Sequence, residues 1–222
     1  MKIDILTLFP EMFDGFLNTS IIKRAIDDNK IEVNLVNFRD YSKDKHKKVD
    51  DYQFGGGGGM VLMPEPIYLA VEDLKTDDSV VILMTPQGKV YNQKMANELS
   101  TSKHLIIICG RYEGFDERIL DIVDMELSIG DYVLTGGEVA SMAVVDSVSR
   151  LIPGVINTDS IVDESFNENL LDYPVYTKPK NFRGKEVPEI LLSGHHKKIE
   201  EWRLEKRIEK TKRKRPDLIE KR

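Results

Sequence analysis

VVILMTPQGKVYNQKMANELSTSKHLIIICGRYEG, residues 80–114, is the stretch that decides the fold. It contains two uninterrupted apolar runs, Val80–Met84 and Leu105–Cys109, each of five residues. Such runs are typical of strands that are buried on both faces of a parallel sheet. The segment between them, Asn92–Leu99, has the apolar spacing of a helix. Because a helical crossover makes the two strands it connects parallel, this stretch predicts a strand–helix–strand unit of an α/β domain.

The same alternation of strands and helices continues on both sides of this unit. Lys2–Phe9 and Ile31–Phe38 alternate polar and apolar residues, which predicts two more strands. Helical spacing occurs in five further segments, the second with Ser20 as its expected N-cap: Pro10–Leu17, Ile21–Asp28, Pro66–Leu74, Glu113–Ile122 and Glu138–Val148. We therefore predict an α/β domain with a mainly parallel sheet over residues 1–156.

The character of the sequence changes after Pro153-Gly154. The segment that follows is polar and acidic and has no clean period, which predicts an interdomain linker or active-site loop at residues 157–170. From Val187 onward the pattern is helical and increasingly basic. The sequence thus predicts a small second domain, helical and basic, over residues 171–222.

Composition excludes several classes of protein. The chain has 222 residues, and its longest apolar runs are far shorter than the roughly 20 residues that a membrane helix needs. An acidic residue at position 4, Asp4, argues against a signal peptide. The single cysteine, Cys109, excludes an intrachain disulfide framework and a cysteine-based zinc cluster. These features predict a cytoplasmic protein without a membrane partner.

Charge is distributed unevenly along the chain. Residues 195–222 carry 12 Lys/Arg and 6 Asp/Glu, which is a net charge of +6. Because the whole chain has a net charge of −6, the other 194 residues have a net charge of −12. The tail contains the basic cluster Lys210–Arg215, whose charge suits nucleic-acid phosphates. Charge alone, however, favours a solvated helical tail, and both interpretations stay open at this point.

Glycine-rich segments suggest a binding site. Thr85–Gly88 follows the first buried strand, Gly110–Gly114 follows the second, and Ser128–Glu138 carries three glycines before a helix. In open α/β sheets, small ligands bind beyond the carboxyl ends of the strands, so we predict a pocket formed by these three loops. The run Gly55–Gly59 is either a flexible linker or a backbone that approaches a ligand or another segment closely.

Common nucleotide and metal motifs are missing. The sequence has neither Gly-x-Gly-x-x-Gly nor Gly-x-x-x-x-Gly-Lys-Ser/Thr, which counts against a Rossmann cofactor site and a P-loop. No spacing typical of metal ligands is present. The neighbours His195 and His196 are expected to begin a helix rather than to bind a metal, and a magnesium requirement is left open.

Seven ordered motifs resemble one family across almost the whole chain, from Phe9 to Leu218. This chain resembles the bacterial tRNA (guanine-37-N1)-methyltransferases of the SPOUT class in the segments Leu8–Phe13, Gly55–Met60, Thr85–Gly88, Cys109–Gly114, Ser128–Glu138, Asp146–Arg150 and Leu191–His196.

The resemblance implies a fold, a reaction and partners. The α/β domain would be of SPOUT type, with a deep trefoil knot near its C-terminal end, against the general rule that chains are not knotted. S-adenosyl-L-methionine would donate a methyl group to N1 of the guanine on the 3′ side of the tRNA anticodon, guanine-37. The enzyme would act as a homodimer, each active site being completed by the partner chain.

The resemblance also implies roles for individual residues. Glu164, directly before Ser165-Phe166, matches the base that removes the N1 proton, and Arg150 matches an essential arginine that could stabilise charge on guanine O6. Lys212, Arg213, Lys214 and Arg215 match a basic tail that contacts tRNA. The residues expected to bind the cofactor are Thr85, Pro86, Gln87, Gly88, Gly110, Arg111, Tyr112, Glu113, Ile129, Gly130, Asp131, Tyr132, Val133 and Leu134.

Several alternatives accompany these roles. The family commonly has Asp where this chain has Glu164, so the neighbouring Asp163 is a second candidate for the base. Arg150 considered alone would be interpreted as a cap of the preceding helix. The rival functions are a catalytically inactive tRNA-binding homologue and a SPOUT methyltransferase that acts on another RNA position.

Overall fold

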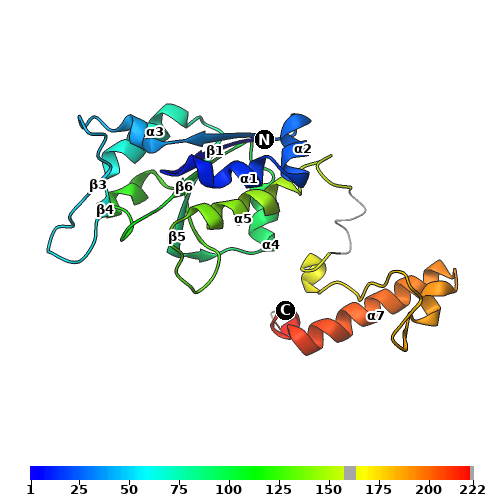
Figure 1. Ribbon diagram of the computed structural model, residues 1–222. Helices are drawn as coiled ribbons and strands as arrows, with labels where there is room; N and C mark the ends of the chain where they lie inside the picture. Colours follow the sequence, from blue (N-terminus) through cyan, green and yellow to red (C-terminus); the bar gives the residue numbers. More distant parts are fainter. Residues whose placement is uncertain (158–163, 221–222) are drawn as a thin grey trace. The chain divides into compact units, whose positions relative to one another are not determined.

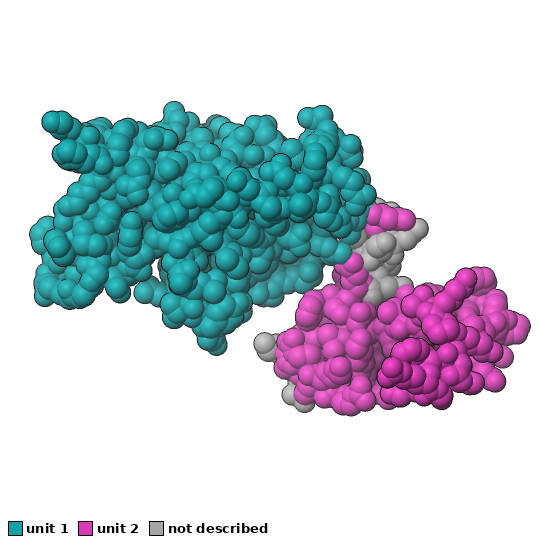
Figure 2. Space-filling view, in the orientation of Figure 1, with its two compact units in different colours: residues 1–156 teal, residues 157–222 magenta. Residues whose placement is uncertain are grey.

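A computed structural model describes residues 1–157 and 164–220. By its internal contacts the chain divides into two compact units, residues 1–156 and 157–222, which Figure 2 colours separately. The first is called unit 1 and the second unit 2, and each is described by itself. No helix of the described residues is both long and apolar enough to cross a membrane.

Unit 1 is built on a five-stranded parallel sheet with the strand order β2-β1-β6-β5-β7. All six residues of β6 are buried, as expected for the central strand of a sheet covered on both faces. The predicted α/β class is therefore confirmed. The strands are β1 (Lys2–Leu6), β2 (Glu32–Val36), β5 (Ser79–Val90), β6 (His104–Cys109) and β7 (Met125–Ser128).

Helices cover both faces of this sheet and form two apolar layers. In β6, Leu105, Ile107 and Cys109 face the layer of α4 and α5, whereas Ile106 and Ile108 face the layer of α3. Figure 1 shows α5 and α1 on one side of the strands and α3 on the other. The helical elements are η1 (Pro10–Phe13), α1 (Asp14–Leu17), α2 (Ser20–Asp27), η2 (Phe38–Tyr41), α3 (Pro64–Leu74), α4 (Gln93–Leu99), η3 (Glu117–Ile122) and α5 (Glu138–Ser149).

The long strand β5 contains the segment Thr85–Gly88, which was predicted as a loop. Met84 and Lys89 both pair with Leu127 of β7, so the four residues between them leave the ladder and return to it. The segment is a bulge within a strand rather than a turn after one. The neighbouring strand β7 was not predicted, because only four residues form it and they alternate poorly.

Other boundaries also differ from the predictions. The helix predicted at Glu113–Ile122 is only the short 3-10 helix η3, since Tyr112 and Gly114 have φ angles of 60° and 116°. Ser20 is the first residue of α2 and not its N-cap; Thr19 takes that position, and its hydroxyl donates instead to the carbonyl of Gly15 at 2.6 Å. A small ladder of β3 (Asp50–Asp51) and β4 (Val61–Leu62) flanks the glycine run.

Unit 2 is organised along one long helix, α7 (His196–Lys214), which begins at His196 as its sequence predicted. The segments before it are the 3-10 helix η4 (Asn167–Asn169), the hairpin of β8 (Asn181–Phe182) and β9 (Lys185–Glu186), and the 3-10 helix η5 (Glu189–Leu192). The short helix α8 (Asp217–Glu220) follows. The predicted linker, residues 157–170, lies partly outside the described residues, because 158–163 belong to the undescribed part.

Candidate functional site

A cavity of about 260 Å³ lies in unit 1 where the bulge of β5 meets the carboxyl ends of β6 and β7. This is the edge at which open α/β sheets bind ligands, and the three glycine-containing segments meet there. The lining combines backbone and small residues with apolar and aromatic side chains. It comprises Met84, Thr85, Pro86, Gly110, Arg111, Tyr112, Glu113, Gly114, Phe115, Leu127, Ser128, Ile129, Gly130, Tyr132, Val133, Leu134, Thr135, Gly136, Gly137 and Ala140.

The structure brings eleven of the fourteen predicted cofactor residues together in this lining. Gln87, Gly88 and Asp131 are the three that do not line the cavity. Gly88 has a packing role instead, because a Cβ at this position would lie 2.5 Å from the backbone nitrogen of Leu127. The bulge can therefore lie against β7 only if residue 88 has no side chain.

The sequence predicted the loop Ser128–Glu138 as part of the pocket, but Ala140, in the first turn of α5, was not predicted to line it. A Cβ on Gly137 would lie 2.9 Å from the Cα of Cys109, so this glycine lets the helix approach the end of β6. Ala140 continues the small-residue surface one turn later. The signal in the sequence was the pair Gly136-Gly137 followed by small residues, which is a sign of close backbone approach.

Arg111 and Glu138 fix one wall of the cavity. Glu138 is fully buried and accepts hydrogen bonds from Thr7 Oγ1 at 2.9 Å and from Arg111 Nε at 3.2 Å. The Arg111 guanidinium also lies 4.5 Å from the ring centre of Phe9 and donates to the carbonyl of Thr135 at 3.3 Å. One side chain thus ties the ends of β1 and β6 to α5. Separating a buried ion pair costs free energy, because it leaves an uncompensated buried charge. The pair therefore resists movement of this wall.

The buried thiol beside this site has little chemical activity. Cys109 is fully buried at the end of β6, and its Sγ lies 3.4 Å from Ser141 Oγ. Burial raises the pKa of the Cys109 thiol, so the thiolate form is disfavoured. Among the described residues no cluster of three or more His, Cys, Asp or Glu side chains could hold a metal ion.

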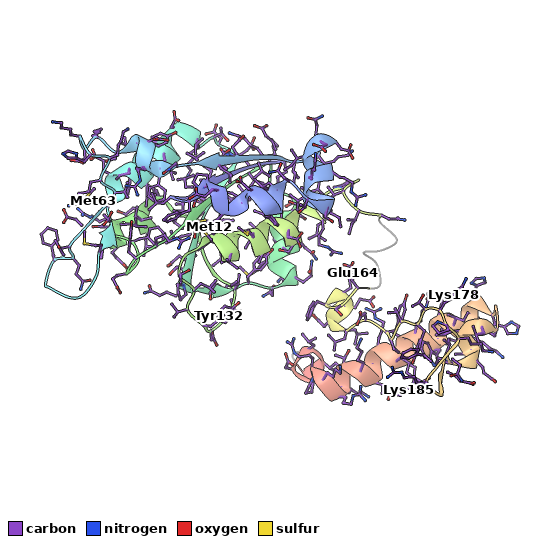
Figure 3. The ribbon with its side chains drawn as sticks, in the orientation of Figure 1. Met12, Met63, Tyr132, Glu164, Lys178 and Lys185 are labelled. Carbon is purple, nitrogen blue, oxygen red and sulfur yellow. The ribbon has the colours of Figure 1, made fainter. Side chains whose placement is uncertain are left out.

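The predicted catalytic residues lie in different units. Arg150 is the C-cap of α5 in unit 1, and its backbone nitrogen donates to the carbonyl of Asp146 at 3.1 Å. Glu164 is at the start of the described part of unit 2 (Figure 3). Asp163, the alternative base, lies outside the described residues. The pairing of Arg150 with Glu164 in one active site therefore stays a prediction.

The basic tail of unit 2 is exposed at the end of α7. Lys212, Arg213 and Lys214 form the last helical turn, and cations at this position complement the negative end of the helix dipole. Arg215 is the C-cap, and its guanidinium forms a two-point ion pair with Asp217 at 2.9 and 2.7 Å. The tail thus presents three adjacent cations together with one that is already paired.

A second basic surface on unit 2 was not predicted from the sequence. Residues 176–185, which lead into and include most of the hairpin of β8 and β9, carry four exposed cations together with the exposed rings of Tyr176 and Phe182. The cations, called the hairpin cations, are Lys178, Lys180, Arg183 and Lys185. Within the described part of the chain, none of the four cations forms an ion pair with a carboxylate. Figure 3 labels Lys178, before the hairpin, and Lys185, on it. Cations interleaved with exposed aromatic rings are the sequence signal that could have revealed it.

Comparison with known proteins gives this site a family. Residues 1–221 match the family described as tRNA (Guanine-1)-methyltransferase TrmD. A tRNA (guanine-N(1)-)-methyltransferase of Malacoplasma penetrans is 59% identical, over 99% of this chain and 97% of that protein. The chain belongs to the tRNA (guanine-N1)-methyltransferase family. The family resemblance found in the sequence is thereby confirmed.

Other members of the tRNA (guanine-N1)-methyltransferase family are similar to almost the same extent. The Staphylococcus carnosus protein is 58% identical, over 100% of this chain and 91% of that protein. The Moorella thermoacetica protein is 56% identical, over 99% of this chain and 90% of that protein. The similarity therefore includes both units, and not only the sheet domain that contains the cavity. The chain is a methyltransferase of this family, and such an enzyme requires a methyl donor.

Proposed function

We propose that this protein transfers a methyl group from S-adenosyl-L-methionine to N1 of guanine-37, on the 3′ side of the tRNA anticodon. The observation that carries the proposal is the cavity between the bulge of β5 and the carboxyl ends of β6 and β7, in a chain of this family. Its lining suits the donor, because glycine backbone can bind the adenine edge and the amino-acid end while Leu127, Ile129 and Ala140 contact apolar parts. When bound, S-adenosyl-L-methionine supplies an electrophilic methyl group.

The chain's own residues must then manage one proton and one developing charge. Guanine N1 carries a proton that has to leave as the new N–C bond forms, and the Glu164 carboxylate accepts it. As that proton leaves, negative charge grows on guanine O6, and the permanently charged Arg150 guanidinium stabilises it. A positioned general base typically contributes ~10²–10⁴-fold to the rate, and charge stabilisation adds to this.

Unit 2 provides the surfaces for RNA in this proposal. Its tail (Lys212, Arg213, Lys214 and Arg215) and its hairpin cations bind phosphates, while Tyr176 and Phe182 offer exposed faces for bases. Tyr52 and Phe54, the exposed aromatic residues before Gly55–Gly59, support a homodimer whose partner chain completes each active site. The proposal includes a cytoplasmic enzyme and a SPOUT-type trefoil knot in unit 1, where the three loops around the cavity would interlock.

One assay tests the reaction directly. The full-length protein is incubated with methyl-labelled S-adenosyl-L-methionine and an unmodified tRNA transcript, and the nucleosides are then separated and identified. The expected product is 1-methylguanosine at position 37, lost when guanine-37 is replaced by adenine. A methylated ribose or another modified position would favour the rival SPOUT activity. Tight tRNA binding without any labelled nucleoside would identify an inactive binding homologue.

A further inference from the structure

The loop that carries Glu164 has a strained backbone. Phe166, Glu168 and Asn169 have φ angles of 77°, 54° and 60°, in the left-handed region that non-glycine residues rarely adopt. Inside the loop, Phe166 N donates to the carbonyl of Leu170 at 2.6 Å, and Ser165 Oγ accepts from Asp172 N at 3.1 Å. Strained backbone of this kind persists only where the surroundings determine it. Residues 164–172 therefore need contacts from outside the loop to keep this shape.

The C-terminal half of α7 holds the loop through three side chains. Thr211 is fully buried; its hydroxyl accepts from Leu171 N at 2.9 Å and donates to the carbonyl of Arg207 at 2.7 Å. Arg207, also buried, donates from Nη2 to the carbonyl of Asn167 at 3.1 Å. Lys210 Nζ pairs with Asp172 Oδ1 at 2.6 Å. These three side chains are called the α7 clamp.

Charge reinforces the clamp at neutral pH. The hydrogen bond from Lys210 holds the pKa of Asp172 below its usual value, so the carboxylate stays ionised and the ion pair persists. Figure 1 shows the short helix η4 against the C-terminal end of α7, which agrees with these contacts. The loop is thus fixed at Asn167, Leu171 and Asp172.

The α7 clamp and the basic tail belong to the same helix end. The last turn of α7 exposes Lys212, Arg213 and Lys214, one turn or less beyond Thr211. Arg215 lies with its guanidinium 5.9 Å from the ring centre of Phe166, two residues after Glu164. Any movement of this helix end is therefore transmitted to the loop that carries the carboxylate.

We propose that Arg207, Lys210 and Thr211 are positioning residues, which hold the Glu164 loop on the RNA-binding end of α7 so that RNA contact and proton removal are set by one rigid element. The inference rests on the proposed function, since it needs Glu164 as the base. It predicts that loosening the clamp slows proton removal without weakening either substrate's binding. A placement error of about 1 Å can cost roughly 10²-fold in rate, so the loss is expected to be large.

The first test compares three full-length variants in single-turnover methyl transfer with saturating tRNA and S-adenosyl-L-methionine. Thr211→Val keeps the shape and removes the hydroxyl, and we expect its rate to fall by about tenfold or more, with the affinities for tRNA and S-adenosyl-L-methionine within about twofold of wild type. Thr211→Ser restores the hydroxyl and should restore most of the rate. Lys206→Met, which removes a half-buried neighbour paired only with Glu209 in the described residues, is the matched control. Equal rates for all four proteins would overturn the proposal.

A double-mutant cycle with Glu164→Gln separates positioning from general damage. If the clamp acts through Glu164, Thr211→Val should change the residual rate of Glu164→Gln by less than about twofold. If the rate of the double variant is instead lowered by the product of the two single losses, the clamp's role is overturned, while Glu164 remains the base. If Glu164→Gln alone does not slow the reaction, the proposed base fails, which is a different result.

A further variant keeps the test decisive if Thr211→Val does not fold. Asp172→Asn removes the carboxylate that Lys210 binds and leaves the charge of α7 unchanged. Because Asp172 is partly exposed, we expect this variant to fold with an unchanged thermal midpoint of unit 2. Its rate should fall by about threefold or more and, again, should not fall further in the Glu164→Gln background. A wild-type rate in Asp172→Asn would count against the clamp.

Discussion

Two adjacent carboxylates, Asp163 and Glu164, compete for the role of base, and only one of them can face guanine N1 in a fixed loop. We predict that Glu164→Gln lowers the single-turnover rate by at least ~10²-fold, the low end for losing a general base. The amide keeps the shape of the side chain, so both substrates should still bind.

Asp163→Asn is the matched control for this prediction. It removes the neighbouring charge and should stay within a few-fold of the wild-type rate. A slow Asp163→Asn with a normal Glu164→Gln would move the assignment one residue back. Normal rates for both variants would exclude a side-chain base at either position.

A further prediction concerns Asp4, which is fully buried in the middle of β1, between β2 and β6. Burial alone would raise its pKa, but Lys2 at 2.9 Å, Asn34 at 2.8 Å and His104 at 2.9 Å outweigh burial and lower the pKa. A pKa lowered by folding means that the ionised form stabilises the folded state at neutral pH. This contribution should be lost as the pH falls below about 4, the unfolded value, through the lower folded pKa.

Asp4→Asn should therefore lower the free energy of unfolding at pH 7 by about 1–3 kcal/mol, the range for leaving buried partners unsatisfied. The variant should also lose part of the decrease in stability that the wild type shows below about pH 4. Urea unfolding followed across pH 3–7 measures both quantities. Asp27→Asn, which removes an exposed carboxylate paired with Lys23, is the control and should leave the stability nearly unchanged. Identical acid profiles for wild type and Asp4→Asn would contradict the argument.

Helices and strands with a strong pattern in their own sequence could be predicted, whereas those that depend on distant partners could not. The buried runs in β5 and β6 and the long periodic helix α7 carry their own signal, and the structure confirms them. Strand β7 carries no such signal, because its four residues become a strand only by pairing with β5. The helix expected at Glu113–Ile122 shortened because the backbone at Tyr112 and Gly114 takes left-handed angles that serve the cavity.

The same distinction applies to the candidate site. Glycine loops after apolar strands predicted most of the cavity lining, since the parallel sheet brings those strand ends to one edge. The pair Arg111 and Glu138 was not predictable, because it joins residues 27 positions apart and has no local pattern. The contacts of Thr211 with the Glu164 loop, 40 positions away, were hidden for the same reason.

We predict that both basic surfaces of unit 2 contribute to tRNA binding. Replacing the hairpin cations Lys178, Lys180, Arg183 and Lys185 by Ala should weaken tRNA binding and flatten its salt dependence. Each lost phosphate contact should lower the slope of log affinity against log salt by about 0.7–0.9. The same change in the tail, at Lys212, Arg213, Lys214 and Arg215, should have an effect in the same direction. Affinity measured at four or more salt concentrations gives the slopes.

Two controls accompany this prediction. S-adenosyl-L-methionine affinity should not change, because the described residues that line the cavity all belong to unit 1. A second control removes four lysines of unit 1 that are paired with carboxylates and should leave the slope nearly unchanged; they are Lys23, Lys75, Lys94 and Lys103. An unaltered slope for a surface variant would mean that this surface is only solvated.

For the whole molecule we predict a homodimer. Tyr52 and Phe54 are 78% and 101% exposed directly before Gly55–Gly59, and exposed aromatic residues of this kind are typical of interfaces. Sedimentation at micromolar concentration should give about twice 25.4 kDa. Phe54→Ser should shift the equilibrium toward the monomer and reduce methyl transfer in proportion. A stable monomer with full activity would contradict the prediction.

The position of Cys109, the only cysteine in the sequence, allows its reactivity to report the opening of unit 1. Cys109 ends the central strand β6, is fully buried, and has its pKa raised by burial. A thiol reagent reacts with the thiolate, so modification must wait for an excursion in which the sheet opens. Since the sequence has no other cysteine, the labelling rate of the intact protein measures the opening of unit 1. A ligand bound in the adjacent cavity should lengthen the half-time of labelling, so the labelling rate of Cys109 also reports ligand binding.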